Sequence, residues 1–129
     1  MDKNRVWLYC RADSKDNSRA VLTTQKRRLE RYANRHSLNI VGCSSDIGSG
    51  LSLDRQGLLE FHIAMEEGQM DMLLLQNISR LCQDLDTLFQ YWQVLREHNV
   101  RLCTVTNGEV SLDIDPISSG IFPGIQEGR

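Results

Sequence analysis

The sequence predicts an α/β fold with a parallel-type central sheet of about four or five strands, flanked by helices. Three observations predict this fold. Short runs of β-forming residues alternate with amphipathic helical patterns, which is the order of successive βαβ units. Residues 72–75 are apolar without alternation, as in a central strand that is buried on both faces. The length of 129 residues suits one domain with one core.

The chain opens with an expected strand, loop and helix. Residues 6–10 are rich in β-formers and predict a buried strand, and the polar residues 13–19 predict a loop. Apolar side chains then recur near helical spacing and predict an amphipathic helix of about four turns. These side chains are Leu22, Leu29, Tyr32 and Ala33. The other side of this helix carries four arginines, which we interpret as a solvated face: Arg27, Arg28, Arg31 and Arg35.

A second strand, a loop and a second helix follow. Residues 39–43 contain Ile40 and Val41 and predict the strand. Residues 44–56 are small and polar, with Gly48, Ser49 and Gly50 together, and predict a flexible loop. Residues 57–67 predict a helix that Gly68 ends.

The last third of the chain predicts two more strands around a third helix. Residues 70–76 contain the buried central strand, and residues 84–98 carry a helical apolar stripe behind Asp84 as the cap. Residues 101–106 predict the final strand, and Asn107-Gly108 a turn. We therefore expect one domain over residues 1–106. Residues 107–129 are expected to form a short extended piece and a tail without a DNA-binding module.

Bulk composition excludes several classes of protein. Fifteen basic and seventeen acidic residues leave a net charge of −2, unlike a strongly basic DNA-binding domain. Contact with DNA is then expected from a local group of arginines or from a segment that this chain lacks. No apolar run is long enough to span a bilayer, and the N-terminus lacks a signal-peptide core, so we expect a cytoplasmic protein. The four cysteines lack zinc-type spacing, and three are expected as buried strand residues: Cys10, Cys43 and Cys103.

The segments after the first three strands carry the candidate functional side chains. In a parallel sheet these segments converge beyond the carboxyl ends of the strands. They contain four arginines and three hydroxyls: Arg11, Arg19, Arg55, Arg80, Ser14, Ser49 and Ser79. The planar guanidinium fork suits a phosphate, and several arginines beside a serine can stabilise phosphoryl transfer without a metal. Surface ion pairs are the alternative role for arginines at loop ends.

Several motifs resemble the serine recombinases of the resolvase/invertase family. Tyr9-x-Arg11 at the end of the first strand resembles the start of the family's Tyr-x-Arg-x-Ser pattern. Gln25 is similar to the glutamine that opens the first helix of the family. Asp46-Ile47-Gly48-Ser49-Gly50 and Arg55-Gln56-Gly57-Leu58 resemble two further family segments. Ser79-Arg80-Leu81-Cys82-Gln83 is similar to the family's (Asp or Ser)-Arg-(Leu or Phe)-x-Arg segment. The resemblance runs from about residue 6 to residue 105.

The resemblance implies a reaction and a set of roles. A serine attacks a DNA phosphodiester, forms a 5′-phosphoserine link without metal or ATP, and the ends are rejoined after subunits exchange. Arg11, Arg55 and Arg80 would hold the cleaved phosphate, with Asp46 and Ser49 in support. The remaining matched positions would also contact or support the phosphate: Tyr9, Asp13, Gln25, Ser79 and Gln83. The implied partners are DNA and related recombinase subunits or a second copy, and the expected DNA binding of this chain alone is weak.

Two residues depart from the family pattern. Asp13 stands where the serine belongs, and a carboxylate there adds negative charge beside a phosphate. Gln83 stands where the last arginine belongs, which removes a full charge. Ser14, one residue later, can replace the missing serine only if the strand end bulges. We favour impaired strand cutting over a working Ser14, which leaves either a recombination domain or a non-cutting partner of active relatives.

A different class of protein also stays open. Asp13 and Asp46 both follow or end predicted strands, and two carboxylates there can chelate a divalent cation, as in a receiver-like phosphate- or metal-binding module. A receiver needs adjacent acidic residues after the first strand and a lysine after a late strand. Residues 101–106 have no lysine near them, so the recombinase-type domain is the preferred interpretation.

Overall fold

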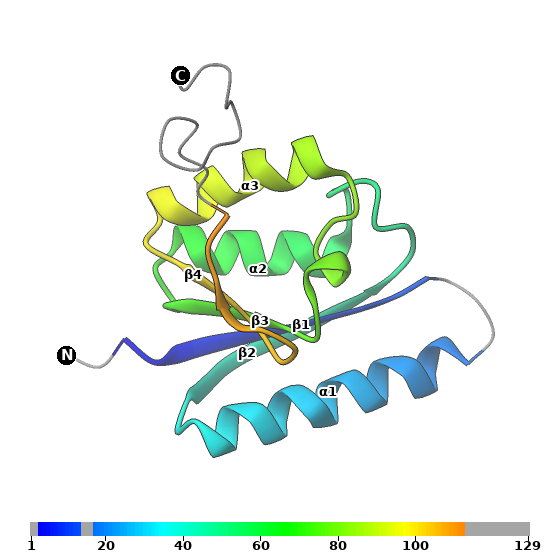
Figure 1. The fold of residues 1–129 in the computed structure, drawn as a ribbon, viewed down its shortest axis with the longest axis horizontal. Coiled ribbons are helices and arrows are strands. Elements are labelled where there is room, and N and C mark those ends of the chain that lie inside the picture. Colours follow the sequence, from blue (N-terminus) through cyan, green and yellow to red (C-terminus); the bar gives the residue numbers. More distant parts are fainter. Residues whose placement is uncertain (1–2, 14–16, 113–129) are drawn as a thin grey trace, which may run out of the picture.

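A computed structural model describes residues 3–13 and 17–112 of the chain. In chain order the elements are β1 (Arg5–Ala12), α1 (Ser18–Arg35), β2 (Asn39–Ile47), α2 (Gln56–Glu66), β3 (Met72–Leu75), the short 3₁₀ helix η1 (Ile78–Arg80), α3 (Leu85–Glu97), β4 (Arg101–Thr104) and β5 (Gly108–Val110). The five strands form one sheet in the order β2-β1-β3-β4-β5. Helix α1 covers one face alone, and α2 and α3 cover the other face (Figure 1). The predicted α/β fold class is confirmed.

The sheet is parallel except at one edge. Strands β1 to β4 pair in parallel, as βαβ units require, and β5 pairs with β4 in the antiparallel sense. The turn expected at residues 107–108 is where this last hairpin reverses, and Leu102 pairs with Val110 across it. The sheet therefore continues past residue 106, where the sequence suggested the end of the domain. Of residues 107–129, expected as a short extended piece and a tail, residues 113–129 lie outside the described residues.

Side chains of β1 alternate between the two layers of the core. Val6, Leu8 and Cys10 pack on the α1 side. Trp7 and Tyr9 pack on the side of α2 and α3. Because successive strand residues point to opposite faces, Arg11 points to the same side as Tyr9. The strand thus carries its polar residues into the layer where α2 begins.

The first two strands are longer than the sequence predicts. Strand β1 continues through Arg11 to Ala12, and the residues 44–47 that were expected in a loop belong to β2. The parallel ladder explains the error, because Tyr9 pairs with Ser44 and Ala12 pairs with Ile47. An edge strand that is largely exposed needs no hydrophobic alternation, so a polar sequence there conceals it.

The bounds of the other helices and strands differ from the predicted bounds by a few residues. Two side chains that the sequence predicts to be buried are exposed. Asp84 caps α3 as predicted, since its side chain accepts a hydrogen bond from the Thr87 amide at 3.0 Å. Leu85, expected in the apolar stripe of α3, is 62 % exposed because it lies at the first turn. Cys43 is exposed rather than buried, because it lies on the edge strand. Within the described ranges, none of the helices combines the length and hydrophobicity needed to cross a membrane.

Candidate active site

Three segments meet beyond the carboxyl ends of β1, β2 and β3, as the sequence predicts. The Gly48 amide donates to the Ala12 carbonyl at 2.8 Å, which joins the ends of β2 and β1. The Gln83 amide donates to the Gly50 carbonyl at 2.7 Å, which ties the segment after β3 to the segment after β2. Side chains from all three segments therefore share one end of the sheet. Arg19 is not among them, because it lies exposed in the first turn of α1.

Arg11 is the buried centre of this site. Its exposed fraction is 0 %, which for a charged residue requires partners on all sides. Its Nε donates to the Arg80 carbonyl at 3.2 Å, and its Nη2 to the Ser79 carbonyl at 3.0 Å. Its Nη1 donates to the Gly48 carbonyl at 2.6 Å. One guanidinium therefore joins the ends of all three segments.

Asp13 also binds this guanidinium. Its Oδ1 lies 2.6 Å from Nη1 of Arg11, and the two side chains form an ion pair. The hydrogen bond from Arg11 and its positive charge lower the pKa of the Asp13 carboxyl below its ordinary value. Four of the five N–H donors of a guanidinium are then used by the protein itself. Ser14 lies outside the described residues.

Asp46, Tyr9 and Arg55 form a second network beside Arg11. Both oxygens of Asp46 accept bonds from the first amides of α2, Gly57 at 2.7 Å and Leu58 at 2.9 Å. The Tyr9 hydroxyl donates to Asp46 at 2.6 Å and accepts from Nη1 of Arg55 at 2.8 Å. Burial, followed by the bond to Asp46, raises the pKa of Tyr9. The network holds Arg55, the residue before α2, against the end of β1.

Arg55 and Arg11 share an acceptor, whereas the Arg80 side chain points elsewhere. Nη1 of Arg55 and Nε of Arg11 each lie 3.2 Å from the Arg80 carbonyl, so the two guanidinium groups are neighbours. Nη2 of Arg55 also donates to the Leu81 carbonyl. Arg80 uses Nη1 to bind the Arg11 carbonyl at 3.0 Å, and its side chain lines a pocket against α1. The guanidinium groups of Arg11 and Arg55 therefore lie next to each other on one side of β1. The side chain of Arg80 lies instead against α1.

Gln25 fixes the end of β1 from the other layer. Its Nε2 donates to the Arg11 carbonyl at 2.8 Å, and its Oε1 accepts from the Arg11 amide at 3.1 Å. Gln25 is 3 % exposed and lies in the third turn of α1, not at the start of the helix as the sequence suggested. The helix begins earlier, at Ser18, so the residues 18–19 expected in a loop are helical.

The two described hydroxyls and Gln83 lie at the rim of the site. Ser49 is exposed and accepts a bond from the Leu51 amide at 3.0 Å, while Ser79 donates to Asn77 at 2.6 Å. Gln83 is exposed, and its Cγ lies 2.9 Å from where a Cβ at Gly50 would stand. Nη2 of Arg11 lies 2.7 Å from the same point. The stem of Gln83 and the Arg11 guanidinium therefore flank Gly50.

Two glycines of the site were not assigned a role from the sequence. A Cβ at Gly57 would stand 2.4 Å from the Ser45 carbonyl oxygen and 2.8 Å from Oδ2 of Asp46. Only glycine lets the start of α2 come close enough for Asp46 to cap it. Gly50 similarly leaves room for Arg11. Both glycines belong to the segments that resemble the family, residues 46–50 and 55–58. The spacing of residues alone does not reveal where two parts of the backbone approach so closely that only glycine fits.

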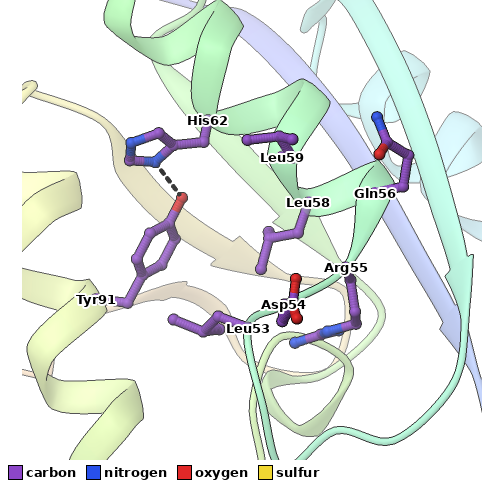
Figure 2. Close-up of a pocket in the computed structure, with 8 residues that line it drawn as sticks. All are labelled: Leu53, Asp54, Arg55, Gln56, Leu58, Leu59, His62 and Tyr91. Atoms are coloured by element: carbon purple, nitrogen blue, oxygen red, sulfur yellow. Dashed lines mark hydrogen bonds between the residues drawn. The ribbon is translucent and has the colours of Figure 1, made fainter.

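A pocket of about 220 Å³ opens on the far side of Arg55 (Figure 2). Leu53, Leu58 and Leu59 line its apolar wall, and His62 faces Tyr91 across it, with 3.0 Å between Nδ1 and the hydroxyl oxygen. Burial raises the pKa of Tyr91. The pocket lies between α2 and α3, and Arg55 borders both this pocket and the arginine site.

The carboxylates that suggested a receiver-like cation site are used elsewhere. Asp13 pairs with Arg11, and both oxygens of Asp46 accept bonds from α2 amides and Tyr9. Donors of the chain itself thus bind Oδ1 of Asp13 and both oxygens of Asp46. In the part of the chain that the structure describes, no three His, Cys, Asp or Glu side chains group as metal ligands.

Comparisons with known proteins agree with one family. The sequence profile described as "Resolvase, N terminal domain" matches residues 6–127. The C-terminal catalytic domain of ISC1926 TnpA, an IS607-like serine recombinase, is 27 % identical, with a TM-score of 0.72 over 78 % of this chain and 70 % of that chain. None of the curated proteins has a significant sequence match.

Two further solved structures share the fold. The N-terminal catalytic domain of TP901-1 integrase is 20 % identical, with a TM-score of 0.73 over 95 % of this chain and 91 % of that chain. A serine recombinase from Sulfolobus solfataricus is 23 % identical, with a TM-score of 0.68 over 96 % of this chain and 89 % of that chain. At such identities the likeness concerns the fold alone.

Proposed function

The chain belongs to the resolvase family of serine recombinases, and we propose that it serves site-specific DNA recombination as a domain whose own strand cutting is impaired. One observation carries the impairment. Asp13, at the position where the family pattern has its serine, binds the buried guanidinium of Arg11 at 2.6 Å. The domain thus keeps the family fold while its reaction is weakened.

The proposed reaction needs positive charge at one phosphate. A serine hydroxyl oxygen attacks the phosphorus, a serine O–P bond forms, and the P–O3′ bond breaks as the leaving 3′ oxygen takes a proton. Attack by a 3′-hydroxyl reverses these steps and rejoins the strand. The neighbouring guanidinium groups of Arg11 and Arg55 support phosphate binding here, with Arg80 as a third cation at the edge. We assign Tyr9, Gln25 and Asp46 to positioning these arginines.

The same geometry explains why cutting is impaired. The Asp13 carboxylate uses an N–H donor that a phosphate oxygen would need, and it adds a negative charge where negative charge develops. Gln83 supplies no charge beside Arg11, and a lost transition-state donor typically lowers the rate by about 10²–10³. Ser14 would have to reach its attacking position to within about 0.5 Å while Asp13 stays next to it. We therefore assign Ser14 at most a weak reaction.

A non-cutting partner is the second candidate function, and the Arg11–Asp13 pair favours it as well. A domain that keeps the family fold but closes its own phosphate site can still pair with active recombinase subunits and act on the DNA that they bind. The proposed partners are accordingly DNA and recombinase subunits, either related chains or a second copy. The proposed location is the cytoplasm, where the chain has access to DNA.

A trapping assay tests the impairment. The full chain is incubated with nicked duplexes of random sequence, in which a cut strand end diffuses away and prevents rejoining, and covalent adducts are separated on a denaturing gel. We expect no adduct from the unmodified chain, and none from the matched variant Ser14→Ala. An adduct that the unmodified chain forms and Ser14→Ala does not would contradict the proposed impairment and assign the reaction to Ser14.

A further inference from the structure

Helix α1 concentrates positive charge, with six of the fifteen basic residues of the chain. It contains six basic residues and one acidic residue, Glu30, which leaves a charge of +5 on a chain whose total is −2. The rest of the chain therefore carries −7. Among the described residues, the helix also lies alone on its face of the sheet (Figure 1), and no other described helix covers its outer side. Its charge is thus presented to solvent on a protein that is otherwise acidic.

Four of the arginines form one stripe along the helix, which we name the α1 arginine stripe: Arg27, Arg28, Arg31 and Arg35. At about 100° per residue they lie within an arc of roughly 100°. All four are exposed, and Glu30 lies outside the arc. Within residues 3–13 and 17–112, no ion pair engages any of them. Gln25, Leu29 and Ala33 form the opposite, buried side.

The stripe continues into the candidate active site. Arg28 and Arg80 line the same pocket of about 260 Å³, together with Thr24 and Gln76. The Nε atom of Arg80 is buried without a hydrogen-bond partner in the described structure, and so is Oε1 of Gln76. An oxygen anion in this pocket would satisfy Arg80, and a flip of the Gln76 amide would present a second donor to it. The pocket therefore connects the exposed stripe to a cation of the proposed phosphate site.

We propose that the α1 arginine stripe and the Arg28–Arg80 pocket bind the sugar–phosphate backbone of DNA next to the phosphate held at the end of β1. Arg28, Arg31 and Arg35 are spaced by about 4.5 and 6 Å along the helix axis, so they form a continuous row of positive charge. Exposed arginines that no ion pair engages release counterions when they bind phosphates, which gives affinity without reading sequence. This inference rests on the proposed function, because it extends the path of the same DNA.

Two double variants of the full chain test the stripe. Arg31→Gln/Arg35→Gln removes two charges from the stripe, and Arg19→Gln/Lys26→Gln removes two charges from exposed positions of the same helix outside it. Binding to a short fluorescent duplex of random sequence is measured by anisotropy between about 50 and 200 mM salt. We expect the stripe variant to lower the slope of log affinity against log salt by about 1.8, since each lost phosphate contact contributes about 0.9. The control variant should retain the slope of the unmodified chain.

Several results would contradict DNA binding by the α1 arginine stripe. An equal decrease of the slope in both variants would mean that net charge, not the stripe, determines the binding. An unchanged slope in the stripe variant would mean that the stripe does not contact DNA. A stripe variant that changes only self-association in sedimentation, or only binding to phosphatidylserine vesicles, would assign the arginines to another partner. None of these measurements depends on strand cutting. If the titration contradicts DNA binding by the stripe, the result of the trapping assay is unaffected. If the trapping assay contradicts the impairment, the titration still tests the stripe.

Discussion

Replacing Asp13 by serine is expected to produce a covalent adduct with nicked duplex DNA, which the unmodified chain does not form, because a regained transition-state donor typically raises the rate by about 10²–10³. The change removes the carboxylate that binds Nη1 of Arg11, so one N–H donor becomes available to a phosphate oxygen. It also places a hydroxyl where the family pattern has its serine. Both effects act on the transition state, in which phosphate oxygens gain negative charge. The denaturing-gel assay measures the product directly.

The matched control separates the two effects of this substitution. Asp13→Ala frees Arg11 equally but supplies no hydroxyl, so it should form no adduct. Adding Gln83→Arg to Asp13→Ser places a further cation beside Gly50, near Arg11, and should raise adduct formation again. If Asp13→Ser is as inert as Asp13→Ala, residue 13 is not the point at which the reaction fails.

Arg11→Leu is expected to lower the free energy of unfolding by about 3–5 kcal/mol, because it removes the central member of a buried network. The Gly48 and Ser79 carbonyls lose the donor that Arg11 supplies, and the Arg80 carbonyl keeps only its bond from Arg55. A buried polar group left without a partner typically costs about 1–3 kcal/mol. Urea unfolding followed by circular dichroism measures the loss, and the midpoint falls with little change in slope.

Asp13→Ala is again the matched control for stability. Asp13 is 63 % exposed, so the ion pair loses much of its strength to solvent, and its removal should cost less than about 1 kcal/mol. A loss below about 1 kcal/mol for Arg11→Leu would show that the three segments hold together without the guanidinium. The contrast between the two variants thus separates the carbonyl contacts of Arg11 from its contact with Asp13.

The sequence predicts the fold well because hydrophobic periodicity reports burial. The strand of residues 72–75 is buried on both faces and reads as a continuous apolar run. The end of β2 was missed for the opposite reason, because residues 44–47 pair with β1 at an edge and need no apolar pattern. Asp46 was therefore expected in a loop, whereas it ends a strand and caps α2.

The sequence indicates which segments lie at one end of the sheet but not how their side chains contact one another. Strand order and loop position bring Arg11, Arg55 and Arg80 to one end of the sheet, and spacing indicates this. The complete burial of Arg11 could not be inferred, since charged residues are rarely buried and its partners are carbonyls, which no residue type encodes. The direction of the Arg80 side chain toward α1, and hence the link to Arg28, likewise depends on tertiary packing.

The pairing of Asp13 with Arg11 is tested most directly by titrating the side-chain carboxyl of Asp13 by ¹³C NMR in the unmodified chain. The bond from Arg11 lowers the pKa of this carboxyl, so its stabilising effect is present above the ordinary value of about 3.9 and disappears as the pH falls through the lowered value. We expect a midpoint clearly below the ordinary value, with the pair intact at neutral pH. A midpoint at or above it would mean that Asp13 leaves Arg11 open to a phosphate.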